Sequence, residues 1–257
     1  MYDDLERPPL RATALTRALA PDGWRVEVVE RAGSTNALLA DRARAGEPAG
    51  LVVVAEEQTA GRGRLDRAWL SPARAGLTFS VLLRPDLPPT QWPWLSLWAS
   101  VAVARSLRER TGVDALLKWP NDVLVGGRKI CGLLAEVPVP GVFVLGVGLN
   151  VTTGRDELPH DRATSLQLEG AEVLDRDTVL RSLLREITRV LAEVAADPAA
   201  GRASYRALCT TIGAVVRVEL PGGAAVEGTA AAVDDNGRLV VDGMPYGVGD
   251  VVHLRLS

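Results

Sequence analysis

The stretch Gly61-Arg62-Gly63-Arg64-Leu65-Asp66-Arg67-Ala68-Trp69 decides how this sequence is interpreted. Its glycines let the backbone approach a ligand closely, and its guanidinium groups offer paired donors to phosphate or carboxylate oxygens. Trp69 adds a flat apolar surface on which a purine can stack. A solvated basic turn with a half-buried tryptophan is the alternative. The stretch has neither the Gly-Lys-Ser/Thr of a Walker A loop nor the third glycine of a dinucleotide-binding loop, which disfavours P-loop and Rossmann enzymes.

A second polar stretch, Lys118-Trp119-Pro120-Asn121-Asp122, stands at the end of an expected strand, and Lys129 begins the next one. The glycine pair at 126–127 predicts a tight turn, so the two lysines bracket one hairpin. A lysine here can neutralise charge on a phosphate or carboxylate oxygen during attack, and Asn121 or Asp122 can hold a magnesium ion or its waters. For Lys129 taken alone, an exposed strand lysine is the alternative.

Helices and strands are expected around these stretches. Capping residues at 34–36 predict a helix start, and helical spacing predicts helices over 92–110 and 178–195, with a weaker one over 10–20. Strands are expected at 51–55, 77–83, 115–119, 123–125, 129–137 and 142–150. After Gly213 the strands become short and are separated by turns, which is typical of a small β-barrel.

The composition limits the class of protein. The 257 residues are 47% hydrophobic, enough to bury a real core in one large domain or two. The formal net charge of −3 argues against a general polyanion binder. The two cysteines and two histidines are isolated, so a zinc site is not expected. Without a signal peptide or an apolar run of about 20 residues, we expect a cytoplasmic protein that binds no membrane.

Taken in order along the chain, the motifs resemble those of the biotin protein ligase family. Members carry a Gly-Arg-Gly-Arg-x-Gly-Arg-x-Trp loop, a Lys-Trp-Pro-Asn-Asp segment, a lysine before a small-residue, glycine and aliphatic run, and a Gly-x-Gly-x-Asn strand. The corresponding stretches here are 61–69, 118–122, 129–136 and 146–150. Upstream, 33–36 and 57–59 match the segments that contact biotin in the family, and the β-rich C-terminal end resembles the family's last domain.

The resemblance implies an α/β (α+β) fold, in which a mixed central sheet flanked by helices forms a class II synthetase-like biotin/lipoate ligase catalytic domain. A small SH3-like β-barrel follows. We expect the catalytic domain over residues 1–210 and the barrel over residues 211–257. The residues before the matching region carry no basic cluster and no recognition-helix pattern. We therefore expect the short form of the family, which lacks an N-terminal DNA-binding domain and binds no nucleic acid.

The resemblance also implies roles for individual residues. Biotin would be bound through hydroxyl, amide and cationic groups by Ser34, Thr35, Asn36, Gln58, Arg62 and Lys129. ATP and the adenylate would be bound by Arg64, Arg67, Trp69, Lys118, Asn121 and Asn150. Lys129 and Arg64 would be catalytic, Lys129 by holding the biotin carboxylate and the α-phosphate together. Asp122 would bind Mg²⁺.

The implied reaction has two steps. The biotin carboxylate attacks the α-phosphate of ATP, which gives biotinyl-5′-AMP and pyrophosphate, and the mixed anhydride then acylates a lysine of a biotin carboxyl carrier protein, a subunit of acetyl-CoA or another acyl-CoA carboxylase. ATP and biotin are the expected substrates, with Mg²⁺, and the protein would be a monomer or homodimer. No covalent enzyme intermediate is needed, so Cys131 is interpreted as an apolar filler of its strand. A lipoate ligase or octanoyl transferase, and a non-catalytic biotin-binding module, are the alternatives.

One position departs from the family pattern, because Asp66 stands where members usually have glycine. Aspartate visits positive φ more readily than most residues, so the loop can still form. We hypothesise that this carboxylate weakens retention of the adenylate, in which case Asp66→Gly slows its release. An unchanged rate of adenylate dissociation would exclude the effect.

Overall fold

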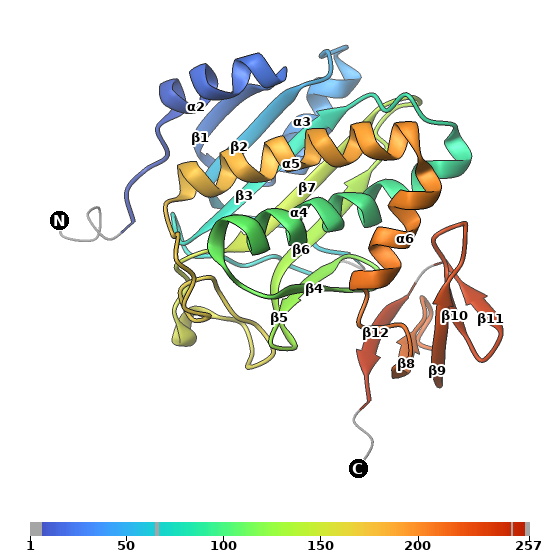
Figure 1. Ribbon diagram of the computed structural model, residues 1–257. Helices are drawn as coiled ribbons and strands as arrows, with labels where there is room; N and C mark the ends of the chain where they lie inside the picture. The colour runs from blue at the N-terminus through green and yellow to red at the C-terminus, as the bar shows by residue number, and fades with distance from the viewer. Residues whose placement is uncertain (1–6, 65–66, 248, 255–257) are drawn as a thin grey trace.

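Figure 1 shows a large sheet covered by helices and a smaller sheet at the C-terminal end. The computed structural model describes residues 7–64, 67–247 and 249–254. The large sheet is seven-stranded, in the order β1-β2-β3-β7-β6-β5-β4. Strand β1 runs parallel to β2 and all other neighbours are antiparallel, so the sheet is mixed, as expected. Its strands are β1 Arg25–Ala32, β2 Leu51–Gln58, β3 Gly76–Leu83, β4 Ala115–Lys118, β5 Asp122–Val125, β6 Arg128–Glu136 and β7 Phe143–Asn150.

Helices cover the two faces of this sheet unequally. Helices α4 (Leu95–Thr111) and α5 (Arg176–Ala196) lie side by side over one face, and α3 (Thr35–Arg44) covers part of the other (Figure 1). Alternate side chains of a strand point to opposite faces. In β2, Val52 belongs to the core that includes α4 and α5, whereas Val53 belongs to the smaller core beneath α3. The sequence of β2 is therefore hydrophobic at successive positions.

The chain passes from α5 through α6 (Pro198–Leu208) into a five-stranded antiparallel sheet of order β11-β10-β9-β8-β12, which matches the small β domain expected at this end. Two tryptophans fasten one turn of this sheet to the rest of the protein. The indole N–H of Trp94 donates to the carbonyl of Asp235 at 2.8 Å, and that of Trp119 donates to the carbonyl of Gly237 at 3.0 Å. The strands are β8 Val215–Glu219, β9 Ala225–Val233, β10 Leu239–Val241, β11 Met244–Tyr246 and β12 Asp250–His253.

The remaining helices are short. They are α2 Ala12–Leu19 and the 3-10 helices η1 Ala20–Asp22, η2 Pro89–Trp94 and η3 Arg155–Glu157. The helix expected from Trp92 begins as η2, which contains Pro93, and becomes α-helical only at Leu95. Strands β1 and β11 and helix α6 had no counterpart among the predicted elements.

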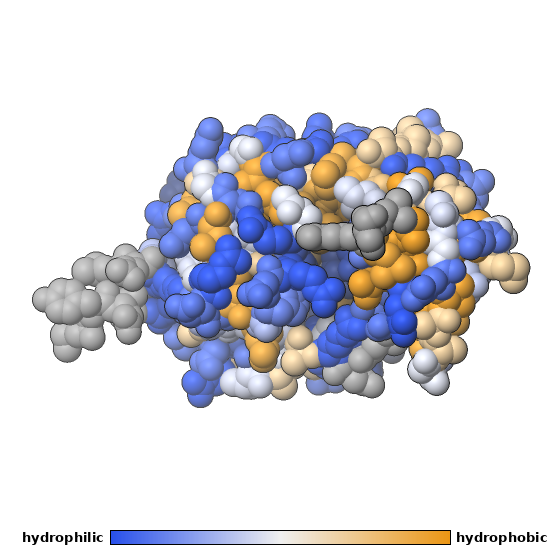
Figure 2. Space-filling model, turned by 90° about the horizontal axis from the view of Figure 1, so that it is seen from below, coloured by the Kyte–Doolittle hydropathy of each residue, from blue (hydrophilic) through white to orange (hydrophobic). Residues whose placement is uncertain are grey.

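The outer surface is mixed in character. Seen from below, hydrophilic side chains dominate, and hydrophobic residues appear between them in separate areas (Figure 2). Of the helices in the described ranges, none is long and apolar enough to cross a bilayer.

Candidate active site

A cavity of about 1110 Å³ gathers side chains from α3, the large sheet, the arginine-rich loop after β2 and the C-terminal sheet. It brings together every residue for which a binding or catalytic role was predicted: Ser34, Thr35, Asn36, Gln58, Arg62, Arg64, Arg67, Trp69, Lys118, Asn121, Asp122, Lys129 and Asn150. Segments that are far apart in the sequence thus face a single space. The individual roles of these residues stay predictions.

The strand register builds the floor of the cavity. Across four antiparallel strands, Lys118 pairs with Asp122, Asp122 with Gly132, and Gly132 with Gly148. Paired residues on adjacent strands project from the same face. The next residue of β6, Leu133, projects from the opposite face into the hydrophobic core. The floor is therefore bare backbone at the two glycines, with a charged edge beside it.

Trp69 lies over the bare part of this floor. A Cβ built on Gly148 would overlap Cε2 of the indole, and one built on Gly132 would lie 3.2 Å from its Cζ3. The indole Nε1 is buried and has no hydrogen-bond partner within the described ranges. The two glycines therefore make room for the ring, which presents an aromatic surface to a ligand while its N–H group lies against the glycine floor.

Lys129 reaches this face because of a β-bulge. Leu124 pairs with Lys129 and Val123 pairs with Cys131, so Ile130 is an extra residue in β6. An extra residue locally disrupts the regular alternation of side chains along a strand. Lys129 lines the cavity, whereas Ile130 and Cys131 are both fully buried. With regular alternation, the lysine would lie on the same face as Cys131, in the hydrophobic core.

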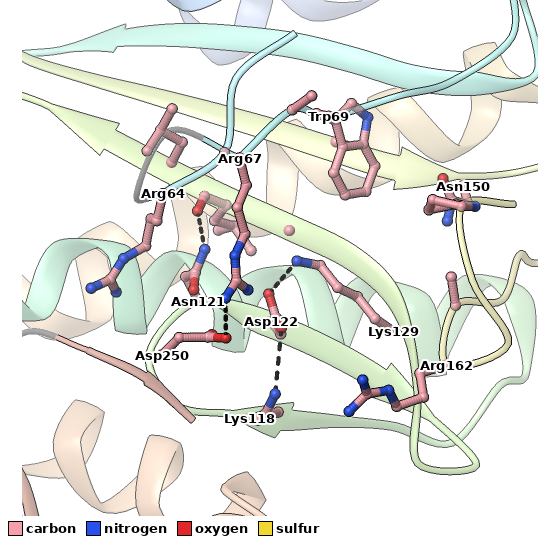
Figure 3. A pocket seen from close by; sticks show the side chains of 18 of the residues that line it. Arg64, Arg67, Trp69, Lys118, Asn121, Asp122, Lys129, Asn150, Arg162 and Asp250 are labelled. Atoms are coloured by element: carbon pink, nitrogen blue, oxygen red, sulfur yellow. Dashed lines mark hydrogen bonds and ion pairs between the residues drawn. The ribbon is translucent and has the colours of Figure 1, made fainter. Parts of the chain in front are cut away.

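Asp122 lies between the two lysines (Figure 3). Its Oδ1 is 2.6 Å from Nζ of Lys129, and its Oδ2 is 4.0 Å from Nζ of Lys118. Burial lowers the pKa of Lys118, and the carboxylate of Asp122 opposes this shift. Nζ of Lys129 also lies 5.7 Å from the ring centroid of Trp69, within cation–π range. The chain contains only these two lysines, so all its side-chain amines line this cavity.

The arginine-rich loop contacts the C-terminal sheet. Nη2 of Arg67 lies 2.6 Å from Oδ2 of Asp250 at the start of β12, and 3.9 Å from a carboxylate oxygen of Glu219 at the end of β8. Burial lowers the pKa of Arg64, and Asp250 opposes that shift. Figure 3 shows both arginines and Asp250 around one end of the cavity. The smaller sheet thus contributes an acidic side chain, Asp250, for which no role was predicted.

The other end of the cavity carries uncharged hydrogen-bonding groups beside one ion pair, that of Arg62 with Glu136. Ser34 precedes α3 at the cap position, as expected, but its side chain makes no capping hydrogen bond in the part of the chain that the structure describes. The N–H and hydroxyl of Thr35 lie 2.8 and 3.1 Å from Oε1 of Gln58 and donate to it. The NH₂ group of Gln58 therefore points away from Thr35.

Glu136 closes this end. Nη2 of Arg62 lies 3.1 Å from each oxygen of the Glu136 carboxylate, and Nδ2 of Asn36 donates to the same carboxylate at 2.7 Å. Glu136 ends the motif over 129–136, yet it received no predicted role. The sequence gives no sign that it meets Arg62, which lies 74 positions away.

Two predicted ATP contacts bind backbone carbonyls. Nδ2 of Asn121 donates to the carbonyl of Leu133 at 2.7 Å, and Nδ2 of Asn150 donates to the carbonyl of Thr164 at 2.9 Å. The segment held by Asn150 carries Arg162, which Figure 3 shows at the edge of the cavity and which had no predicted role. Both amides thus fix the cavity wall, and their contact with ATP stays a prediction.

Asp122 was also predicted to bind Mg²⁺. Over the described ranges, no group of three or more His, Cys, Asp or Glu side chains is arranged to hold a metal ion. Mg²⁺ in nucleotide sites commonly uses one or two carboxylates together with substrate phosphates and waters. A single carboxylate therefore fits an ion that arrives with ATP, and Oδ2 is the oxygen of Asp122 less closely paired with a lysine.

Two further expectations concern Cys131 and Asp66. Cys131 is fully buried, and burial raises the pKa of its thiol far above the usual value, which agrees with a filler and disagrees with a nucleophile. Asp66 lies outside the described residues, so its effect on the adenylate stays a prediction.

Comparison with known proteins agrees with this arrangement. Residues 28–151 match the biotin/lipoate A/B protein ligase family, and residues 211–253 match the biotin protein ligase C terminal domain. The biotin–[acetyl-CoA-carboxylase] ligase of Mycobacterium tuberculosis is 48% identical to this chain, over 98% of each sequence. The likeness thus includes both sheets.

Solved structures have the same architecture. The biotin protein ligase of Aquifex aeolicus in complex with biotin and ATP matches with a TM-score of 0.76 and 29% identity, over 90% of this chain and 99% of that one. The biotin protein ligase of Leishmania major in complex with biotinyl-5-AMP gives a TM-score of 0.65 and 26% identity, over 90% and 98%. Sequence motifs, cavity and relatives agree, and this chain belongs to the biotin protein ligase family.

Proposed function

We propose that this protein is an ATP-dependent biotin protein ligase, which forms biotinyl-5′-AMP and transfers biotin to a lysine of a carrier protein. The main support for this proposal is that the two ends of one cavity differ in charge. Lys118 and Lys129 make one end cationic, whereas Thr35 and Gln58 make the other a neutral hydrogen-bonding wall. A ligand with a phosphate-bearing half and an uncharged polar ring matches that division. The name of the Mycobacterium tuberculosis relative gives the same activity.

In the first step, an oxygen of the biotin carboxylate attacks the α-phosphorus of ATP, and the bond to the bridging oxygen breaks to release pyrophosphate. Two anions must meet, and Lys129 binds both, while Arg64 stabilises charge on the phosphoryl oxygens. Arg67 and Lys118 bind the remaining phosphate oxygens. Trp69 covers the adenine.

The biotin ring occupies the neutral end in this proposal. Ser34, Thr35 and Gln58 provide its hydrogen bonds, and Arg62 closes the end through its ion pair with Glu136. We place these groups, with the cationic end, in a catalytic domain over residues 1–210, and we assign residues 211–257 to the C-terminal domain.

In the second step, the amine of the carrier lysine attacks the acyl carbon of the adenylate, AMP leaves, and the amine loses a proton. The protein need not supply a nucleophile, in keeping with the full burial of Cys131. We propose the biotin carboxyl carrier subunit of acetyl-CoA carboxylase as the acceptor. The carboxylase in the relative's name supports this choice.

Mg²⁺ would neutralise phosphate charge when it is bound with ATP. Asp122 is the residue that would hold it, and Asn121 keeps the adjoining strand in place through the carbonyl of Leu133. Replacement of Asp122 by asparagine should raise the Mg²⁺ concentration needed for half-maximal activity. An unchanged Mg²⁺ requirement would remove Asp122 from this role.

The test is exchange of labelled pyrophosphate into ATP with Mg²⁺, using biotin, lipoate and octanoate in parallel. Exchange with biotin alone supports adenylation of biotin, and mass spectrometry of a carrier domain then shows whether one lysine gains biotin. Exchange with lipoate or octanoate instead would make the protein a ligase for those acids. Binding of biotin without exchange would indicate a non-catalytic module.

A further inference from the structure

A chain of hydrogen bonds runs beneath the neutral end of the cavity, and its central member is Asn36. The hydroxyl of Ser80 on β3 donates to Oδ1 of Asn36 at 2.6 Å, and Nδ2 of Asn36 donates to Glu136 at 2.7 Å. Oγ of Ser80 also lies 2.7 Å from Oγ1 of Thr35. Ser80 is fully buried. The chain therefore links Thr35, a predicted biotin contact, to a carboxylate.

Glu136 helps to determine which group donates and which accepts in each hydrogen bond of this chain. A carboxylate accepts hydrogen bonds and has no proton to donate, and the same holds for the carbonyl of Leu134, 3.2 Å from Nδ2 of Asn36. Asn36 must therefore turn its NH₂ group toward these acceptors and its oxygen toward Ser80. An amide oxygen only accepts, so the single proton of the Ser80 hydroxyl is committed to Asn36.

The hydroxyl of Thr35 is constrained in turn. Because the Ser80 proton is committed, a hydrogen bond between Ser80 and Thr35 has to use the proton of Thr35. The other neighbour of this hydroxyl is Oε1 of Gln58, at 3.1 Å, which also only accepts. The Thr35 hydroxyl proton is therefore donated either to Ser80 or to Gln58, and both acceptors belong to the cavity wall. Toward a ligand, Oγ1 offers lone pairs and acts as an acceptor.

Close packing holds the chain in place. Ser80 and Leu134 both pair with Gly146 in the sheet, one from each side, so the three residues form a row directly under Asn36. A Cβ built on Gly146 would overlap Oδ1 of Asn36. The amide therefore rests on bare backbone, and both its oxygen and its NH₂ group have hydrogen-bond partners, which favours one arrangement.

We propose that Glu136 and Ser80 are positioning residues that make Thr35 an obligate acceptor, and that the cavity thereby selects an acid whose ring carries an N–H group at this place. The inference rests on the proposed function. The ureido ring of biotin carries two N–H donors, whereas lipoate and octanoate carry none. An acid without such a donor leaves a buried acceptor unpaired, which is costly.

The test compares biotin with its two carbamate analogues, in each of which an oxygen atom replaces one ureido N–H. Dissociation constants are measured by calorimetry without ATP, and kcat and KM by pyrophosphate exchange, for the wild-type protein and for Ser80→Ala and Glu136→Gln. Ser100→Ala is the matched control, because Ser100 is also a buried serine but donates to the carbonyl of Leu97 in α4, at 2.6 Å.

The wild-type protein should bind biotin about 100-fold more tightly than the poorer analogue, since the oxygen of that analogue faces another acceptor. Ser80→Ala removes the nearer of the two oxygens that can accept the Thr35 proton, at 2.7 Å against 3.1 Å for Oε1 of Gln58, and should reduce this ratio about tenfold. Glu136→Gln removes the charged acceptor of Asn36 but leaves the carbonyl of Leu134, so it should reduce the ratio by a smaller factor. Ser100→Ala should keep the full ratio.

A ratio that stays at the wild-type value in both variants would overturn the inference, even if their melting temperatures fall, because a merely structural role weakens binding of all ligands alike. Failure of the proposed function gives a different result. In that case the wild-type protein itself would neither bind biotin nor support exchange with it.

Discussion

Nζ of Lys129 lies 2.6 Å from Oδ1 of Asp122, so the cation assigned to two ligand anions is already paired with a carboxylate of the protein. Any phosphate or carboxylate that binds this ammonium group must share it with Asp122 or displace that side chain. The bulge at Ile130 gives Lys129 its direction, and Asp122 gives it a fixed position. Both features are made by the protein's own residues, which is what a preorganised electrostatic site requires.

Lys129→Ala should lower kcat for adenylation about 100- to 1000-fold, because it removes a donor aimed at charge that develops during attack. Pyrophosphate exchange at saturating ATP and biotin measures this effect. Arg25→Ala provides a control, since Arg25 pairs with Glu47 on the surface at 2.9 Å. Retention of more than a tenth of the wild-type kcat would show that Lys129 is not catalytic.

We expect KM for ATP to rise at alkaline pH because Lys118 loses its proton there. Burial lowers the pKa of this lysine, with Asp122 opposing the shift, so the charged form is lost at lower pH than for an exposed lysine. Only the protonated amine attracts phosphate, and KM for ATP should rise as pH increases through the lowered pKa. Lys118→Arg should move this rise to higher pH, because arginine remains charged there. Identical KM profiles for the two proteins would exclude Lys118 as the titrating group.

Gly148→Ala should displace Trp69, since the added Cβ would overlap the indole. We expect KM for ATP to rise about tenfold through the lost stacking surface and a shift in tryptophan fluorescence, with little change in KM for biotin. Gly154→Ala is the control, because its Cβ would meet only the carboxylate of Glu157, at 3.4 Å. Normal ATP binding in Gly148→Ala would mean that Trp69 makes no contact with the nucleotide.

The pair formed by Arg67 and Asp250 predicts that the C-terminal sheet influences ATP binding. Arg67→Ala should raise KM for ATP about tenfold through loss of a phosphate contact, and Asp250→Asn should raise it about threefold by releasing the arginine from its position. Glu219→Gln should have less effect, because Glu219 lies 3.9 Å from Arg67 and Asp250 lies at 2.6 Å. Equal effects of the two acidic substitutions would contradict this order.

The buried ion pair between Arg176 and Glu56 should make a large difference to the free energy of unfolding. Nη1 of Arg176 lies 2.7 Å from Oε2 of Glu56, and their side chains are only 6% and 2% exposed. Arg176→Met should destabilise the protein by about 3–5 kcal/mol in urea unfolding, because it leaves the Glu56 charge buried and unpaired. The exposed pair of Arg44 with Asp41 offers a contrast, and Arg44→Ala should cost under about 1 kcal/mol. Similar losses in both variants would contradict this explanation.

The sequence predicted site residues successfully where several functional side chains lie close together in one short segment. Loop 61–69 and segment 118–122 identified cations that the structure places in one cavity, and the mixed sheet with a small β domain was confirmed. Strand β1 escaped prediction because four of its eight residues are charged, which suits an edge strand with one exposed side but weakens the hydrophobic pattern.

The missed site residues depend on contacts between distant segments. Asp250 meets Arg67 only because the C-terminal sheet packs beside the loop, and Ser80 acquires its role only through the register with Gly146. A serine in a hydrophobic strand and an aspartate after a glycine are common in sequences. Their meaning depends on tertiary neighbours, which local patterns do not specify.

Because both lysines line the cavity, an acylating reagent can reach the side-chain amines of this protein only through the mouth of that cavity. The acyl adenylate assigned to the first step is itself such a reagent. If it escapes, the other basic side chains that it meets are arginines and histidines, which form no stable amide. Self-modification is thereby confined to the N-terminal amine and two partly shielded lysines. In a mixture of enzyme and carrier, amide-linked label on any other lysine must belong to the carrier.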